Sequence, residues 1–186
     1  RRSTAYKGTI TQRVSIDQRP SIVDEKSRIG DWEADLMLGG QGGGALLTVV
    51  ERKSRWTCMA RLPSKQSEVV AEALINVLWP YKKQVKTVTL GNGNEFAQHV
   101  NVSKALQASV YFAHPYCAWQ RGLSENTNGL LRQYFLTGTN FKIIRQAKLD
   151  QIHKRLNQRP RQGCIFNSTT DLSTGKILKH HCALQS

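Results

Sequence analysis

Three apolar segments separated by turn-forming residues follow one another early in the chain. In the first, residues 31–38, four apolar side chains occupy alternate positions and share one face: Trp32, Ala34, Leu36 and Leu38. This period of two is typical of a strand. A glycine-rich turn at 39–44 leads to a second, largely apolar segment at 45–51, and a third follows at 55–62. Because such short connections join antiparallel neighbours, the sequence predicts a three-stranded meander.

After the meander, the pattern alternates between helix and strand. The expected elements are a helix at 69–78, a strand at 85–90, a weaker helix at 95–107, a strand at 109–113, and helices at 122–134 and 145–157. Pro80 is expected to end the first of these helices, since proline cannot continue a helical hydrogen-bond ladder. Together these elements predict an α/β fold, a five-stranded mixed sheet with helices on both faces.

The net charge of +14 is unevenly distributed over the 186 residues. Residues 1–30 carry 7 Lys/Arg against 3 Asp/Glu, residues 31–120 carry 9 against 7, and residues 121–186 carry 11 against 3. We therefore expect a basic arm or linker at 1–29, a packed core at 30–160 and a C-terminal tail at 161–186. Basic flanks around a nearly neutral core favour a polyanionic partner, although a solvated basic surface is the alternative.

The composition excludes several other classes of protein. The chain has no unbroken run of 18 apolar residues, so we expect no membrane span and no membrane partner. Its four cysteines, Cys58, Cys117, Cys164 and Cys182, are too far apart for a zinc site. We expect them to be reduced, as in a cytosolic protein.

Two segments carry a specific resemblance to a known family. Residues 30–35 read Gly-Asp-Trp-Glu-Ala-Asp, and residues 121–135 read Arg-Gly-Leu-Ser-Glu-Asn-Thr-Asn-Gly-Leu-Leu-Arg-Gln-Tyr-Phe. They resemble the first and third catalytic signatures of bacterial transposases of the insertion-sequence-thirty family, which are related to retroviral integrases. The resemblance extends from about Val14 to Phe166 and implies an RNase H-like, integrase-type catalytic core.

The resemblance also implies a chemistry. In the family, three carboxylates hold two divalent ions, Mg²⁺ or Mn²⁺, for DNA cleavage and strand transfer. Two hard cations about 3.5–4 Å apart can activate the attacking oxygen and stabilise the leaving one. By this resemblance Asp35 and Glu125 are the catalytic, metal-binding residues. It further implies DNA partners (transposon ends and target), a homo-oligomer, a bacterial cytoplasmic location at the nucleoid, and no small-molecule substrate.

The middle carboxylate of the family pattern is missing from this chain. The family pattern resembles Asp-Asn-Gly-x-Glu-Phe, whereas this chain has Gly91-Asn92-Gly93-Asn94-Glu95-Phe96. The 33 residues at positions 92–124 give the spacing to Glu125 that the family motif requires. Since glycine has no side chain to bind a metal, we expect weakened metal binding and severe loss of activity. Asn92 is expected to face away, and Glu95 could substitute only if its loop rearranged.

Other side chains are candidates for contacts with DNA. On the predicted helix, Arg121, Asn128 and Arg132 share the face of Glu125; the alternative is an ion pair between Glu125 and either arginine. Phosphate contacts are expected from the densest basic stretch, which consists of Lys142, Arg145, Lys148, Lys154, Arg155, Arg159 and Arg161. A solvated helix face is the alternative. Trp119 is a candidate for stacking on a base or for loop packing, and Trp32, Trp56 and Trp79 are expected in the core.

Three functions are therefore open. The first is a transposase catalytic core that Gly91 has impaired. The second is a non-catalytic DNA-binding or dimerising domain, acting as an inhibitor or surviving as a remnant. The third is a nuclease that keeps its activity through a rearranged site.

Overall fold

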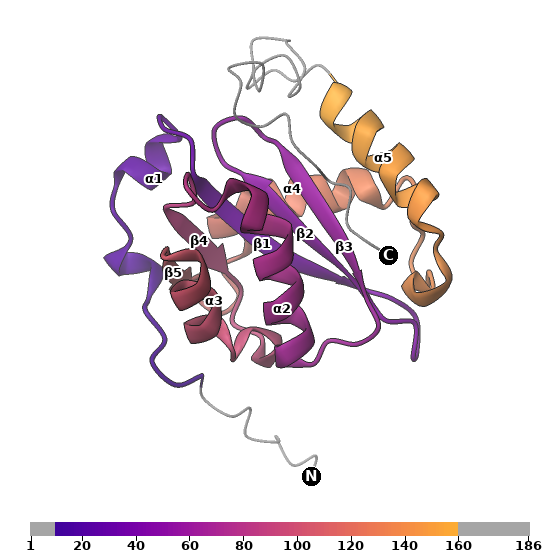
Figure 1. Cartoon of the computed structure of the whole chain (residues 1–186), viewed down its shortest axis with the longest axis horizontal. Coiled ribbons are helices and arrows are strands. Elements are labelled where there is room, and N and C mark those ends of the chain that lie inside the picture. The colour runs from indigo at the N-terminus through magenta and orange to yellow at the C-terminus, as the bar shows by residue number, and fades with distance from the viewer. Residues whose placement is uncertain (1–9, 160–186) are drawn as a thin grey trace.

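The computed structural model describes residues 10–159, and its centre is a five-stranded sheet with the order β3-β2-β1-β4-β5 (Figure 1). The strands are β1 (Asp31–Leu38), β2 (Ala45–Glu51), β3 (Thr57–Leu62), β4 (Thr87–Leu90) and β5 (Ser109–Phe112). β1, β2 and β3 form the predicted antiparallel meander, while β4 runs parallel to β1 and to β5. The predicted mixed five-stranded α/β sheet is confirmed.

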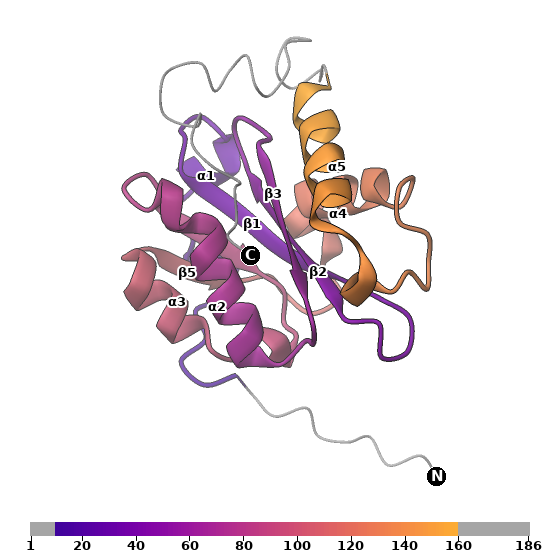
Figure 2. The same cartoon turned by 45° about the vertical axis from the view of Figure 1, so that its right-hand side comes forward.

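Helices cover both faces of the sheet. α2 (Ser67–Leu78) and α3 (His99–Leu106) lie on one face, and α4 (Gly122–Leu131) and α5 (Gln146–Gln158) lie on the other (Figures 1 and 2). α2 ends before Pro80, as predicted, and continues as a short 3-10 turn. The other short helices are α1 (Ile22–Glu25), η1 (Ile16–Gln18), η2 (Trp79–Tyr81), η3 (Asn94–Phe96), η4 (Ala118–Arg121) and η5 (Phe141–Ile143). No helix within residues 10–159 has the length and apolar character that crossing a membrane requires.

The sheet separates two hydrophobic clusters. The cluster beneath α2 and α3 includes Trp32, Ala34, Leu47, Leu74 and Phe112. The cluster beneath α4 and α5 includes Met37, Leu46, Leu131, Phe135, Leu149 and Leu156. Because side chains alternate along a strand, Glu33 and Asp35 share the α4 side of β1 with Met37. A helix thus covers the acidic side of β1.

The described part of the predicted arm, residues 10–29, packs against the edge of the sheet. The Phe112 N–H donates to the Val14 carbonyl at 2.9 Å, and Ser15 forms an isolated parallel bridge with Phe112. Ile16 and Val23 are buried. Residues 1–9 and the predicted tail at 161–186 lie outside the described residues.

Of the three tryptophans expected in the core, two are buried and one is exposed. Trp32 and Trp56 are buried, as predicted, but Trp79 is 53% exposed, so that prediction was wrong. Trp79 is the residue that caps α2, directly after the buried Leu78, and the Lys82 Nζ lies 4.4 Å from its ring centroid. Cys58 is buried, with its Sγ 3.9 Å from the Tyr81 hydroxyl, and Cys117 is half-buried, while Cys164 and Cys182 lie outside the described residues.

Candidate active site

Asp35 lies in the middle of β1, and two side chains, one just before α4 and one on it, contact its carboxylate. Arg121, the residue before α4, places Nη1 2.8 Å from Asp35 Oδ1. Asn128, on α4, donates from Nδ2 to Asp35 Oδ2 at 3.0 Å. The hydroxyl of Thr48, on the neighbouring β2, donates to the Asn128 side-chain oxygen at 2.9 Å and so fixes the orientation of the amide. An ion pair with Arg121 therefore engages one carboxylate oxygen of Asp35, and a hydrogen bond from Asn128 engages the other, although the Arg121 Nη1 makes no hydrogen bond of regular geometry with a described residue.

Glu125 lies on the same helix, between the two residues that contact Asp35. Asn128 follows it by three positions, so these two residues share one face of α4, whereas Arg121 precedes the helix and has a non-helical backbone conformation. The side chain of Glu125 is exposed. The ion pair of Arg121 is with Asp35 rather than with Glu125, although an ion pair with Glu125 was the expected alternative to DNA contact. The structure thus brings the face of α4 that carries Glu125 to Asp35.

Gly91 lies beside Asp35. In the parallel pairing of β1 with β4, Asp31 is opposite Thr87 and Glu33 is opposite Thr89, and continuing this register by two residues pairs Asp35 with position 91. A Cβ atom at Gly91 would lie 3.2 Å from Cζ and Nη2 of Arg121 and 3.4 Å from its Nη1. A side chain at position 91 would therefore point toward the same place as Asp35, where the guanidinium now lies.

Neither neighbour of Gly91 supplies the missing ligand. Asn92 accepts a hydrogen bond from Arg13 and donates one to the Ala113 carbonyl, so its amide is directed at the sheet edge. The carboxylate of Glu95 folds back onto its own loop, against Gly93, where an added Cβ would overlap it.

The donor set does not fit a pair of divalent ions. Within residues 10–159, no three side chains of the types His, Cys, Asp and Glu cluster closely enough to hold one. Asp35 is engaged by Arg121 and Asn128, and position 91 offers no donor. Compared with the pattern that the sequence resembles, position 91 lacks its carboxylate, and the guanidinium of Arg121 lies beside this position.

A buried residue that the motif comparison did not single out attaches α4 to β1. Glu33, 1% exposed, accepts a hydrogen bond from the Ser124 backbone N–H at 3.0 Å, in the first turn of α4. Its other oxygen accepts from Arg52, whose guanidinium also lies 3.4 Å from Asp24. The signal was available in the sequence, because Glu33 stands two residues before Asp35 and must share its side of β1.

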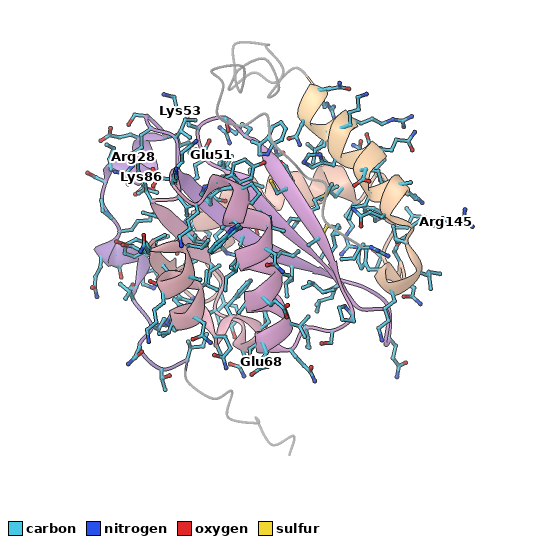
Figure 3. All side chains as sticks on the ribbon, in the orientation of Figure 1. Arg28, Glu51, Lys53, Glu68, Lys86 and Arg145 are labelled. Atoms are coloured by element: carbon cyan, nitrogen blue, oxygen red, sulfur yellow. The ribbon has the colours of Figure 1, made fainter. Side chains whose placement is uncertain are left out.

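The other predicted DNA-binding residues lie mainly on α5. Lys154, Arg155 and Arg159 are exposed, and Arg161 lies outside the described residues. The remaining cations of the basic stretch, Lys142, Arg145 and Lys148, are also exposed, and Figure 3 shows Arg145 projecting outward where α5 begins. Arg132, which directly follows α4, is half-buried, and its Nη1 has no hydrogen-bond partner among the described residues.

The loop before α4 exposes two aromatic rings. Trp119 is 73% exposed and Tyr116 fully exposed, so Trp119 does not pack into the loop. His114, in the same loop, lies 2.8 Å from Asp17, and this hydrogen bond lowers the pKa of the Asp17 carboxyl.

Comparisons with known proteins place the chain among transposases. No protein-family model matches it. It is 39% identical over 158 residues to the transposase for insertion sequence element IS4351 of Bacteroides fragilis, a match covering 85% of this chain and 48% of the relative. It is 36% identical over 158 residues to the transposase InsI for insertion sequence element IS30A of Escherichia coli (strain K12), covering 84% of this chain and 41% of the relative. The chain belongs to the insertion-sequence-thirty family of transposases. The family predicted from the two signatures is confirmed, and the chain spans about half the length of these curated relatives or less.

Solved structures show the fold of this transposase-family chain. The catalytic core domain of bovine immunodeficiency virus (BIV) integrase superposes with a TM-score of 0.57 at 18% identity, covering 78% of this chain and 94% of that one. A chain of the simian T-cell lymphotropic virus intasome in complex with PP2A regulatory subunit B56 gamma superposes with a TM-score of 0.64 at 18% identity, covering 84% and 59%. The predicted RNase H-like, integrase-type fold is confirmed.

Proposed function

We propose that this chain is the catalytic-core region of a DNA transposase that still binds DNA but no longer cleaves it. The observation that carries the proposal is the contact between Asp35 on β1 and the α4 face that bears Glu125, with Gly91 beside Asp35. Three acidic positions would converge there in an intact family member. In the proposal, residues 30–160 form the core, and Asp35 and Glu125 are its remaining catalytic carboxylates.

The loss of cleavage follows from the chemistry of the ligand set. Mg²⁺ prefers several hard oxygen donors in a nearly octahedral arrangement. Glycine at position 91 supplies none, and Asp35 is already engaged by an ion pair with Arg121 and a hydrogen bond from Asn128. Any divalent ion at this site would add positive charge beside the Arg121 guanidinium. Nicking and strand transfer, whether with Mg²⁺ or Mn²⁺, are therefore expected to be severely reduced.

DNA binding depends on residues that the loss of Asp at position 91 leaves in place. In the proposal, the exposed cations of α5, together with Arg132, contact phosphates without reading sequence. Trp119 and Tyr116 offer rings on which an unpaired base can stack. The partners are transposon ends and target DNA. A homo-oligomer and a cytoplasmic location at the nucleoid belong to the same proposal.

A nicking assay tests the inactivity. Labelled duplex DNA is incubated with the full chain and Mn²⁺, and no turnover is expected, whereas Gly91→Asp should recover at least metal binding. Turnover by the wild-type chain that Asp35→Ala abolishes would show that the site still works, and would favour the rearranged nuclease.

Gel shifts over a salt series test the DNA partner. Binding is expected at low salt and should weaken as salt rises, because phosphate contacts release counterions. Absence of binding by the folded chain at low salt would remove DNA as a partner altogether.

The second candidate is an inhibitor that forms dead complexes with an intact transposase. The missing ligand at Gly91 favours it, because such a subunit would occupy an assembly without contributing a working site. Adding the chain to an active family member should then reduce strand transfer in proportion to the fraction of mixed oligomers.

A further inference from the structure

The Arg121 guanidinium fills the space that the missing side chain would use. Its Nη1 lies 2.8 Å from Asp35 Oδ1, and its Cζ and Nη2 lie 3.2 Å from where a Cβ at Gly91 would stand. One cation thus lies between Asp35 on β1 and Gly91, the residue that follows β4. Only glycine at position 91 allows it to approach this closely without the neighbour shifting.

The arginine is well enclosed. The side chain of Arg121 is 16% exposed and that of Asp35 is 23% exposed, so the pair is shielded from most of the solvent. The second oxygen of Asp35 is held by Asn128, which is itself held by Thr48. The charge of Asp35 is therefore balanced by a protein group, and the ion pair joins β1 to the start of α4.

We propose that Arg121 is a resident cation that takes the place of a divalent ion at Asp35. This inference rests on the proposed function, because it takes Asp35 as the former metal ligand. It adds a second obstacle to metal binding. The chain lacks a metal ligand at position 91, and the positively charged Arg121 also lies against the Asp35 carboxylate.

The chemistry of the guanidinium explains why it can hold the position. It stays protonated at all physiological pH values, and it is more weakly hydrated than an ammonium group, so it can remain largely enclosed beside the Asp35 carboxylate. An aspartate introduced at position 91 would bring a second carboxylate within reach of the same guanidinium. Restoring that ligand alone should therefore recover metal affinity only in part, because the new carboxylate can pair with Arg121.

Mn²⁺ binding to the full chain, measured by isothermal titration calorimetry, separates the two obstacles. The variants are Gly91→Asp, the double variant Gly91→Asp/Arg121→Gln, and the control Gly91→Asp/Lys83→Gln. Lys83 is exposed and lies before β4, whereas Gly91 directly follows that strand, so the control removes one positive charge at the far end. We expect no binding by the wild-type chain and weak binding by Gly91→Asp. The double variant should bind about tenfold more tightly than Gly91→Asp, and the control within about twofold of it.

Two results would overturn the resident cation. One is equal Mn²⁺ affinity for Gly91→Asp with and without Arg121→Gln. The other is Mn²⁺ binding by the wild-type chain that Asp35→Asn abolishes. Circular dichroism checks that each variant folds. If Gly91→Asp/Arg121→Gln does not fold, Gly91→Asp/Arg121→Lys replaces it. Its mobile, strongly hydrated ammonium should allow tighter Mn²⁺ binding than Gly91→Asp alone, and no gain over Gly91→Asp would again overturn the proposal.

Gel shifts on the same preparations keep the two proposals apart. If Arg121→Gln brings no gain in Mn²⁺ affinity while DNA binding persists, only the resident cation fails. If the folded wild-type chain does not bind DNA at low salt, the proposed function fails whatever the Mn²⁺ titration gives.

Discussion

Glu33 stands two residues before Asp35, and its carboxylate is buried together with the groups that bond to it, the Arg52 guanidinium and the Ser124 N–H. It is 1% exposed, and the Arg52 that bonds to it is 4% exposed. Asp24 contacts Arg52 from the surface, with a side chain that is 61% exposed. A charge this deep is tolerated only while it is paired and hydrogen-bonded. Glu33 therefore positions α4, and through α4 it positions the residues that contact Asp35.

Neutralising Glu33 should cost stability. In Glu33→Gln the buried Arg52 would lose its buried carboxylate partner and keep the Val23 carbonyl and the exposed Asp24, so the free energy of unfolding is expected to fall by about 3 kcal/mol. Glu68→Gln is the control, since it removes the charge of a carboxylate at an exposed position and should cost much less. Urea denaturation measures both. Equal losses in the two variants would show that burial of Glu33 does not set the cost.

Glu51 gives stability a pH dependence of defined sign. It lies at the sheet end that Figure 3 shows near Arg28 and Lys86, and it accepts hydrogen bonds from the Gly30 N–H at 3.0 Å and the Ser54 hydroxyl at 2.7 Å. Burial raises the pKa of Glu51, and these hydrogen bonds oppose the shift only in part. A raised pKa means that the folded chain binds the proton more tightly than the unfolded chain does.

The contribution of Glu51 is therefore fully present below its unfolded pKa and is lost as pH rises through the folded pKa. Glu51→Gln lacks this titration. The free energy of unfolding of the wild type minus that of the variant should thus decline as pH increases from about 4, and then level off above the raised pKa. Urea denaturation at several pH values follows the difference. A difference that is constant or that rises with pH would contradict the assignment.

At the scale of the element, α4 carries a glycine in its interior, Gly129, and an internal glycine destabilises a helix relative to alanine. Gly129 is exposed, and a Cβ there would meet nothing within 4 Å. Gly129→Ala should raise the free energy of unfolding by about 0.5–1 kcal/mol, since alanine loses less backbone entropy on forming a helix.

Gly39→Ala is the opposing control for this prediction. Its Cβ would lie 2.7 Å from both the Gly43 and the Thr139 carbonyl oxygens, so it should destabilise the glycine-rich turn. Thermal melts of the two variants are expected to shift in opposite directions. A lower melting temperature for Gly129→Ala would mean that this face of α4 is packed against something.

The elements themselves could be predicted because their signals are local. β1 at Asp31–Leu38 and β2 at Ala45–Glu51 have the expected bounds, since alternation and the glycine-rich turn mark both ends. The partner of Arg121 could not be predicted in the same way. Helical spacing relates Arg121 to Glu125, whereas its contact is with Asp35, 86 positions earlier and on a strand. Such a pairing depends on how α4 is placed against the sheet, and the buried Glu33 helps to set that placement.

For the whole molecule, the distribution of charge decides where a polyanion can bind. The buried side of α5 is apolar, with Leu149, Ile152 and Leu156 packed toward the sheet, and its outer side carries exposed cations. α4 and α5 cover the same face of the sheet (Figure 2). The face that holds Asp35 is thus also the face with the basic helix.

The salt dependence of DNA binding should report this arrangement. Each phosphate contact adds about 0.9 to the slope of log K against log salt, so the double variant Lys154→Gln/Arg155→Gln should flatten the slope by about 1.8. Fluorescence anisotropy on a duplex without a chosen sequence, between about 50 and about 200 mM salt, measures it. The variant Lys82→Gln/Lys83→Gln removes the same charge elsewhere, before β4, and should leave the slope nearly unchanged. If both double variants flattened the slope equally, DNA would be responding to the net charge of the chain, and α5 would lose its assignment as the DNA-binding face.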